Sequence, residues 1–468
     1  MCFRSAAFFA LLFVTSACGD DDSPPADAGD SAMPDAGPRD TGAAVDSGDP
    51  ACMVPVDASV TPTDAGPAAP PPDLDCGTPS MPAGTGLRRA PYLQSIDGTS
   101  ARVVWTSTSR GAGALFYATS PAGPWTEVTP ASELFGTSRT GDDVDYVAYE
   151  ARLTGLTADS AYCYRIEEDG VVLAEGLRFD TAWDGATRPV RIVAFGDSGS
   201  GSAEQMTVRD RLLEREYDVF LHLGDMAYGS GTFPEFEANF FDVYRDLMHR
   251  VPVFPTMGNH EFKTENGQPY LDVYHLPEQA LRAEEEERYY SFDYGNVHFV
   301  SLDTNDVRLI EIRLQRNGTI EETGDLMIDW LEADLAASDA DWKIALFHHP
   351  PYTSSTRGFN GQVIDTLRGA LEAGGVDLVL SGHDHHYERM VPTRAGCTAL
   401  PDDGITYIVA GAGGAGLRDL PGRAWMSAAA EDQLHSFLEL EVHGCFARGR
   451  AVSLAGDVID EFWLSGCD

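Results

Sequence analysis

The chain has 468 residues and a formal net charge of −42, with 43% hydrophobic and 10% aromatic residues. This length exceeds one ordinary domain, so we expect two or three folded units. Because the chain is so acidic, its overall electrostatic field is not expected to bind nucleic acid or an anionic membrane surface.

Residues 1–17 are expected to form a signal peptide. Arg4 is the only charged residue before Cys18, and the apolar run Ala6–Val14 is too short to span a bilayer as a helix. Small residues precede Cys18, which resembles a bacterial lipoprotein signal with a lipid on that cysteine. The alternative is a plain secretory signal cleaved near Ala17. Either way we expect export, as a cell-surface or periplasmic lipoprotein or as a secreted protein.

Residues 18–86 are expected to form a disordered tether. They consist mainly of Asp, Ala, Gly, Pro, Ser and Thr, and Arg39 is their only basic residue. Such a segment buries too little apolar surface to offset its chain entropy. A spacer between the N-terminus and the folded part follows from this composition.

The cysteines are consistent with export. None of the six beyond Cys18 forms a C-x-x-C pair, so a zinc knuckle or a thioredoxin-type site is not expected. An exported chain can form up to three disulfides from them, but the sequence leaves the pairing open, with Cys397 and Cys467 both candidates for Cys445. The six are Cys52, Cys76, Cys163, Cys397, Cys445 and Cys467.

Residues 87–182 read as a small all-β sandwich. Short alternating runs are separated by turn-rich segments, which is typical of strands with one buried face. Trp105 is expected in the core. The strands are predicted at 101–105, 113–117, 147–153 and 161–166.

Residues 188–468 read as an α/β domain, a layered β-sandwich flanked by helices. Strands are predicted at 190–195, 219–223, 251–255, 297–302, 343–347, 376–380 and 407–409, with a hairpin over 289–302. The clearest predicted helices are 204–215, 234–248, 324–337 and 362–373.

Five of these strands are followed by polar clusters. Loops at the carboxyl ends of strands in an open α/β sheet converge on one crevice, so we expect the side chains to meet. Carboxylate, carboxamide, imidazole and phenol groups without thiols suit iron, zinc or manganese better than calcium or a structural zinc. The clusters are Gly196–Gly199, Gly224–Tyr228, Gly258–Glu261, His348–Pro350 and Gly382–His385.

In this order the clusters resemble the signatures of the purple acid phosphatases within the calcineurin-like phosphoesterases: GDxG, GDxxY, GNH(D/E), a strand-terminal His and GHxHxYER. Arg89–Gln94, Val103–Trp105 and Leu156–Tyr164 likewise resemble the fibronectin-III-like module that precedes the catalytic domain in many members, with Tyr162 as the tyrosine-corner residue. The resemblance implies three ligands for a first metal, three for a second and one bridging carboxylate. These are Asp197, Tyr228 and His385; Asn259, His348 and His383; and Asp225.

The resemblance implies hydrolysis of phosphate monoesters by attack of a metal-bound hydroxide. His260 is then the expected general acid, His349 an additional imidazole at the rim, and Arg389, with Glu388, a support for ligands or phosphate. The phenolate of Tyr228 favours Fe(III), paired with a divalent Fe, Zn or Mn. His222 and His298, inside apolar strands, are expected to be structural.

Two alternatives and one departure remain open. The same metals could serve a phosphodiesterase, and the chain could instead be a surface-binding protein with a vestigial phosphoesterase domain. Relatives often carry a further histidine in the loop after the strand-terminal one. Here the loop 351–360 has none, although Arg357 or Asn360 could contact phosphate. The natural substrate and the oligomeric state do not follow from the sequence.

Overall fold

The computed structural model describes residues 73–305, 323–400 and 403–466. The predicted signal peptide, Cys18 and most of the predicted tether lie outside these residues. Within the described part of the chain, no helix is long and apolar enough to cross a membrane.

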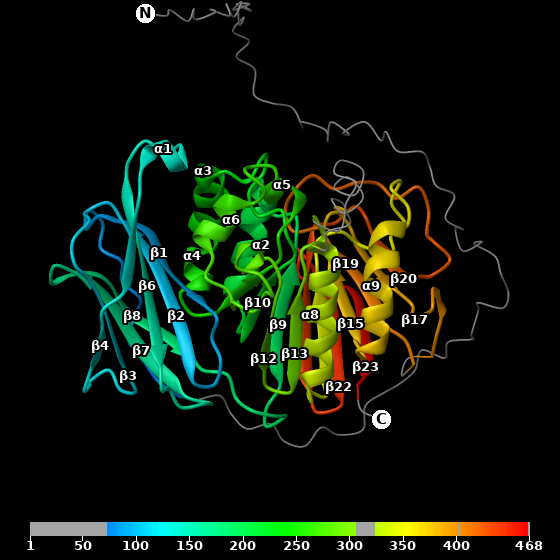
Figure 1. Ribbon diagram of the computed structural model, residues 1–468, viewed down its shortest axis with the longest axis horizontal. Coiled ribbons are helices and arrows are strands. Elements are labelled where there is room, and N and C mark those ends of the chain that lie inside the picture. Colours follow the sequence, from blue (N-terminus) through cyan, green and yellow to red (C-terminus); the bar gives the residue numbers. More distant parts are fainter. Residues whose placement is uncertain (1–72, 306–322, 401–402, 467–468) are drawn as a thin grey trace, which may run out of the picture. The chain divides into compact units, whose positions relative to one another are not determined.

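The N-terminal unit is a sandwich of two four-stranded antiparallel sheets, as expected from its alternating runs (Figure 1). Trp105 is fully buried in its core and stacks on Tyr149. The Tyr162 hydroxyl accepts a hydrogen bond from the backbone N–H of Thr157 at 2.8 Å. One sheet contains β1 (Leu87–Gln94), β2 (Ser100–Ser107), β6 (Tyr146–Thr154) and β5 (Ala131–Phe135), and the other contains β4 (Thr126–Val128), β3 (Gly113–Ala118), β7 (Ala161–Glu168) and β8 (Val171–Asp180).

The end of the predicted tether is attached to this sandwich, which corrects the expected boundary at residue 86. Cys76 forms a disulfide with Cys163 of β7, and Ser80 exchanges two 3.0 Å backbone hydrogen bonds with Glu175 of β8. These contacts order a segment whose composition alone indicated a coil. Cys397 and Cys445 are also disulfide-bonded.

The second unit contains two mixed sheets, in agreement with the expected α/β fold. β9 and β10 pair in parallel, whereas β21 joins β9 antiparallel and begins the C-terminal strands. The six-stranded sheet runs β11 (Val253–Pro255), β10 (Val219–His222), β9 (Val190–Phe195), β21 (Ser436–His443), β22 (Phe446–Ser453), β23 (Val458–Ser465). The seven-stranded sheet runs β12 (Tyr290–Tyr294), β13 (Val297–Ser301), β14 (Trp342–Leu346), β15 (Leu378–Ser381), β19 (Thr406–Ala410), β16 (Tyr387–Met390), β20 (Ser427–Glu431). A short hairpin pairs β17 (Thr393–Arg394) with β18 (Cys397–Thr398).

Both faces of the seven-stranded sheet are covered, because its side chains alternate between two cores. Ile344 and Leu346 belong to the core shared with the six-stranded sheet, whereas Ala345 packs into the core that contains helices α8 and α9. The near-continuous apolar strands are explained by this double burial. The helices are α2 (Ala203–Leu213), α3 (Phe233–Phe236), α4 (Asp242–Met248), α5 (Asn259–Phe262), α6 (Gln268–Val273), α8 (Thr323–Ala337) and α9 (Gly361–Ala373), with α1 (Thr137–Thr140) in the sandwich and a 3₁₀ turn at Ala283–Glu285.

The helix predicted over 234–248 is present, and it contains a π-helical turn that the sequence did not indicate. It begins as α3, passes through a π-helical turn at Glu237–Phe241 and ends as α4. Glu237 pairs with the guanidinium of Arg89 in β1, so an ion pair joins this helix to the sandwich. Tyr92 adds a second link by donating a hydrogen bond to the Val273 carbonyl.

Candidate metal centre

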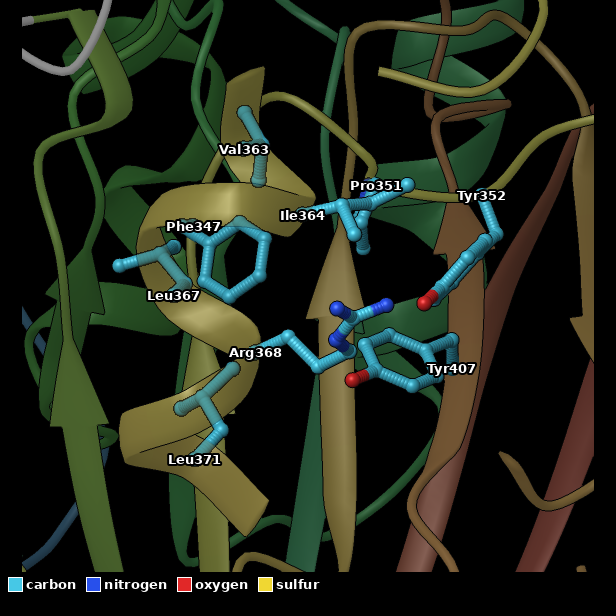
Figure 2. Close-up of a pocket in the computed structure, with 9 residues that line it drawn as sticks. All are labelled: Phe347, Pro351, Tyr352, Val363, Ile364, Leu367, Arg368, Leu371 and Tyr407. Atoms are coloured by element: carbon cyan, nitrogen blue, oxygen red, sulfur yellow. The ribbon is translucent and has the colours of Figure 1, made fainter. Parts of the chain in front are cut away.

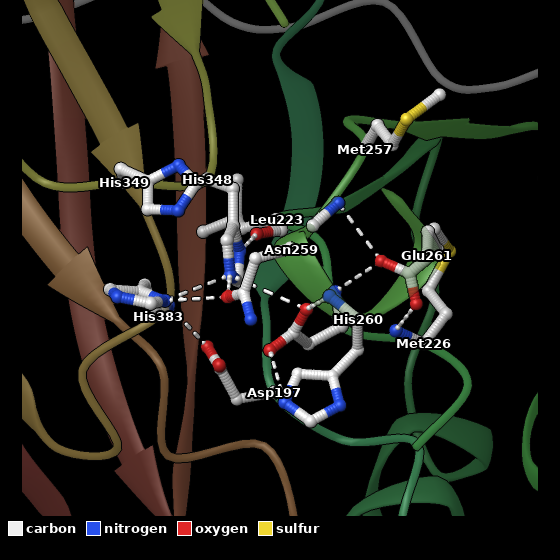
Figure 3. Close-up of polar contacts among 12 residues, drawn as sticks. Asp197, Leu223, Met226, Met257, Asn259, His260, Glu261, His348, His349 and His383 are labelled. Carbon is white, nitrogen blue, oxygen red and sulfur yellow. Dashed lines mark hydrogen bonds and ion pairs between the residues drawn. The ribbon is translucent and has the colours of Figure 1, made fainter. Parts of the chain in front are cut away.

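The five polar clusters follow five strands, and the carboxyl ends of those strands bring them together. Asp197 follows β9, Asp225 follows β10, Asn259 begins α5 after β11, and His348 follows β14. The segment after β15 contributes both His383 and His385. Chain segments that are far apart in the sequence therefore supply one site (Figure 3).

The three residues predicted for a first metal lie in contact with one another. The Tyr228 hydroxyl donates to Asp197 Oδ1 at 3.1 Å and lies 3.1 Å from His385 Nε2. His385 Nε2 lies 3.4 Å from the same carboxylate oxygen. The other ring nitrogen, Nδ1, lies 2.7 Å from the Gly416 carbonyl oxygen, which directs Nε2 toward Asp197.

The three residues predicted for a second metal form a matching group. Asn259 Oδ1 lies 3.1 Å from His348 Nε2 and 2.8 Å from His383 Nδ1 (Figure 3). The two ring nitrogens are 3.2 Å apart. His348 Nδ1 lies 2.7 Å from the Leu223 carbonyl oxygen, so its Nε2 is the nitrogen that faces the group.

Asp225 is positioned to link the two groups. Its Oδ1 lies 3.4 Å from His348 Nε2, and it accepts a 2.9 Å hydrogen bond from the backbone N–H of His260. Ligand-type atoms of Asp197, Asp225 and His348 all lie within 4.8 Å of one another, as do those of His348, His349 and His383. His348 belongs to both sets, so all seven residues predicted as ligands converge on one place.

The backbone at three of these residues is left-handed. Asp197, Asp225 and His383 have φ of 57°, 57° and 67°. Non-glycine residues adopt this region seldom, and such outliers are often found at functional sites. Gly224 and Gly382 permit the close approach, since a Cβ would lie 2.5 Å from His348 Nδ1 at the first and 2.6 Å from Asp197 Oδ2 at the second.

Glu261, to which the sequence analysis gave no role, holds two of the ligand loops. Its carboxylate is fully buried and accepts four backbone N–H groups (Figure 3). These come from Asp225 at 2.7 Å, Met226 at 2.8 Å, Ala227 at 3.0 Å and Gly258 at 2.9 Å. Glu261 is the acidic residue that ends the GNH(D/E) cluster, and this position in the motif could have indicated its role in holding the loops.

The electrostatics of the centre favour a bound cation. Burial by itself lowers the pKa of His348, but the carboxylates of Asp225 and Asp197 outweigh it and raise that pKa to about 9. Burial would raise the pKa of Asp225, yet His348 holds it well below the ordinary value. For Tyr228, burial and the Asp197 carboxylate both raise the pKa. The carboxylates that stabilise a proton on His348 would stabilise a metal cation at the same position.

The donor set fits a pair of transition-metal ions. It offers carboxylate, amide and phenol oxygens with imidazole nitrogens and no thiol; the carboxylate and imidazole residues are buried, and Tyr228 and Asn259 are partly exposed. Hydrogen bonds from Nδ1 to the Leu223 and Gly416 carbonyl oxygens fix the orientation of His348 and His385, which is a common feature of metal-binding histidines.

Two of the three predicted catalytic residues lie beside the ligands. His260 Nε2 is 3.9 Å from Asp225 Oδ2, and its Nδ1 lies 2.8 Å from the Gly229 carbonyl oxygen. Burial lowers the pKa of His260. His349 is fully buried, with Nδ1 2.8 Å from Thr304 Oγ1 and its ring centre 4.5 Å from that of His383.

Arg389 is the third, and the structure corrects this prediction. Its guanidinium donates to the Asp460 carboxylate in β23 through Nε at 2.7 Å and Nη2 at 3.1 Å, and it stacks on Phe462. The side chain of Arg389, on β16 of the seven-stranded sheet, thus reaches across to β23 of the six-stranded sheet. Glu388 contacts His386 and Ser354, which places it behind the ligands.

His222 and His298 are structural, as expected. His222 is fully buried and lies 2.8 Å from Ser198 Oγ, and burial lowers its pKa to about 3. His298 bridges Asp293 and Asp334 through its two ring nitrogens. Asn360 caps α9 by accepting a hydrogen bond from the Val363 N–H.

An apolar gap under α9 is separate from the metal centre (Figure 2). It is lined by Phe347, Tyr352, Leu367, Arg368 and Tyr407. It contains none of the predicted ligands. One of its lining residues, Tyr352, belongs to the loop between β14 and α9 and anchors that loop to the core.

Comparison with known proteins agrees with this fold. Residues 190–387 match the family model of calcineurin-like phosphoesterases, so the second unit is a metallophosphoesterase domain. Residues 90–181 match the N-terminal domain of purple acid phosphatases. Residues 90–387 therefore match, in order, the N-terminal domain of purple acid phosphatases and the calcineurin-like phosphoesterase domain.

Individual relatives are distant. Purple acid phosphatase 23 of Arabidopsis thaliana is 27% identical over 305 residues, which are 57% of this chain and 62% of that protein. An uncharacterized protein of Mycobacterium tuberculosis is 27% identical over 308 residues, 56% of this chain and 57% of its own length. The chain thus spans about three fifths of the curated relatives that it matches.

A solved structure resembles the chain more completely. The purple acid phosphatase PPD1 from yellow lupin (Lupinus luteus) seeds has a TM-score of 0.68, with 81% of this chain and 74% of that chain covered. The sequence identity is 20%, so this is a likeness of fold.

Proposed function

We propose that the protein is a metal-dependent phosphatase that hydrolyses phosphate monoesters. The observation that carries the proposal is the convergence of the Asp197, Asp225 and His348 ligand atoms within 4.8 Å. Three further predicted ligands, Tyr228, Asn259 and His383, contact these or one another. A bound metal pair would act there as a Lewis acid that activates water and neutralises charge on the phosphate.

The residues of the chain would do the remaining work. Asp197, Tyr228 and His385 would hold one metal, Asn259, His348 and His383 the other, and Asp225 would lie between them. Glu261 would keep the Asp225 loop in place through its four N–H contacts. With the Asp225 loop and the Gly258 loop fixed before substrate arrives, little reorganisation is needed during the reaction.

His260 would supply a proton to the departing alcohol. Its Nδ1 faces the Gly229 carbonyl, so in the imidazolium form the N–H on Nδ1 satisfies that oxygen and the proton on Nε2 is the one available to the leaving oxygen. Nε2 is the ring nitrogen that lies near Asp225. His349 is proposed as a second imidazole on the opposite side, beside His383.

Iron is the proposed metal at the Tyr228 side, as Fe(III), with a divalent Fe, Zn or Mn at the other. A phenolate is a hard anionic donor, and it is the residue that distinguishes the two groups of ligands. Burial and the Asp197 carboxylate raise the pKa of Tyr228, and a metal cation bound to its oxygen would favour the phenolate.

We also propose that the protein is exported, and that a lipid on Cys18 anchors it to a membrane. The disulfide between Cys76 and Cys163 supports an oxidising compartment. A Cys18→Ala variant should then leave the membrane fraction when the full chain is expressed in a bacterial host. If the variant stays in the membrane fraction to the same extent as wild type, lipid attachment at Cys18 is contradicted.

Turnover tests the function directly. The purified full chain should release para-nitrophenol from para-nitrophenyl phosphate faster than from the bis ester, and a chelator should abolish this. His383→Ala should reduce turnover at least ~100-fold, the scale expected for loss of a metal-site residue. His443→Ala, at the far end of β21, is the matched control. Faster hydrolysis of the bis ester would favour the phosphodiesterase, and no hydrolysis of either would favour a vestigial domain.

A further inference from the structure

The loop 351–360, between β14 and α9, is held in a fixed shape. Tyr352 packs into the core against Tyr407, with ring centres 4.9 Å apart (Figure 2). The backbone N–H of Asn360 donates to the Pro351 carbonyl at 2.9 Å, which closes the loop on itself. Residues between these points are therefore presented from a rigid base.

Two carboxylates from the segment after β15 hold the middle of this loop. Glu388 accepts the backbone N–H of Ser354 at 2.7 Å and also its hydroxyl. Asp384 is buried and accepts the Ser355 hydroxyl at 2.9 Å. Asp384 lies between the predicted ligands His383 and His385, so the loop is fastened to the metal centre itself.

Arg357 is the cation that this loop brings to the centre. Its Nε lies 3.3 Å from Asp384 Oδ1, and its Nη1 lies beside His383 Nε2. The opposite nitrogen of His383 is the one that faces His348 and Asn259. The guanidinium is thus one imidazole ring away from the proposed ligand atoms, with 33% of the side chain exposed.

Charge explains why such a residue is needed. Asp197, Asp225 and Asp384 place carboxylates around the centre, and the whole chain carries −42. A phosphate monoester carries up to two negative charges, so it meets more of this repulsion than a diester does. A guanidinium fork matches two phosphate oxygens at once.

We infer that Arg357 binds the non-bridging oxygens of the substrate phosphate and gives the centre its preference for monoester dianions. Asp384 is a positioning residue that aims the guanidinium. This inference rests on the proposed function, and it assigns the substrate class of the same site to a residue outside the metal ligands.

The test compares Arg357→Gln and Arg357→Lys with wild type as metal-loaded full chain. The control is Arg209→Gln on α2, whose guanidinium contacts Asp210. Affinity for inorganic phosphate is measured by calorimetry, KM and kcat with para-nitrophenyl phosphate, and bound metal by elemental analysis. Arg357→Gln should weaken phosphate binding and raise KM about 10- to 100-fold, the loss expected for a charge-assisted fork. Arg357→Lys should recover part of this, and metal content should not change.

Unchanged phosphate affinity in Arg357→Gln would overturn the inference. So would loss of bound metal in that variant, because Arg357 would then act by holding His383. Failure of the proposed function looks different: wild type would turn over no ester. The affinity difference between wild type and Arg357→Gln would still decide the role of Arg357.

Discussion

Glu261→Gln tests whether the ligand loops are held by one buried carboxylate. The substitution keeps the size and shape of the side chain but replaces an oxygen with an NH₂ group, which cannot accept a hydrogen bond. Each Glu261 oxygen accepts two backbone N–H groups, at 2.7 to 3.0 Å. Whichever way the amide is oriented, two buried donors then lose their acceptor.

The magnitude follows from those two donors. A buried N–H without an acceptor costs about 1–3 kcal/mol, so two cost about 2–6 kcal/mol. The variant no longer buries a charge, which offsets part of this, and we expect a net loss of about 3 kcal/mol. For a folded unit of this size the melting temperature should fall by about 6–12 °C. Turnover should fall at least ~10-fold because Asp225 moves with its loop.

Thermal unfolding and urea unfolding at pH 8 measure the stability, and para-nitrophenyl phosphate measures turnover. Glu265→Gln is the matched control, since Glu265 is an exposed glutamate four residues further along the chain. It should be indistinguishable from wild type in both assays. If Glu261→Gln stays within about 0.5 kcal/mol of wild type, the four contacts do not hold the loops.

Two further outcomes are expected. Burial would lower the pKa of His298, but Asp293 and Asp334 raise it to about 9. This ion triad stabilises the fold fully below pH ~6.5 and loses its effect as the pH rises through about 9, so wild type should lose about 2 kcal/mol between pH 6 and 10. A pH series of urea unfolding should show that loss in wild type but not in His298→Gln, and equal slopes would contradict it. Tyr228→Phe should remove a visible absorption band from the metal-loaded protein while the fold persists, and an unchanged spectrum would exclude the phenolate as an iron ligand.

Much of the fold could be predicted from the sequence, because each strand carries its own signal. The apolar runs before Asp197, Asp225 and His348 are buried on both faces, so their hydrophobicity shows directly in the sequence. The π turn in the helix over 234–248 could not be seen in this way. It begins at Glu237, which pairs with Arg89, a residue 148 positions earlier in the chain.

The candidate site was predictable as a set of residues but not as a geometry. Glycine followed by Asp, Asn or His at strand ends was visible, whereas the left-handed backbone of Asp197, Asp225 and His383 was not. Arg389 shows the same limit. It lies four residues after His385, yet β16 has already turned its side chain to Asp460. A motif names residues, and the strand on which each lies decides where its side chain points.

The ordered end of the predicted tether has a similar cause. Composition indicated a coil up to residue 86, but Cys76 is fixed by its bond to Cys163 and Ser80 by its pairing with Glu175. A cross-link of this kind overrides local propensity, and the sequence alone gave no pairing for either cysteine.

Elemental analysis of the purified full chain, beside an Asp225→Ala variant, tests the central claim most directly. Asp225 is the carboxylate that links the two groups of ligands, and its removal should affect both. We expect two metal ions per chain in wild type, iron among them, and fewer than one in the variant with the fold intact. A wild-type chain that binds no transition metal, or a variant that keeps both ions, would contradict the assignment of this centre.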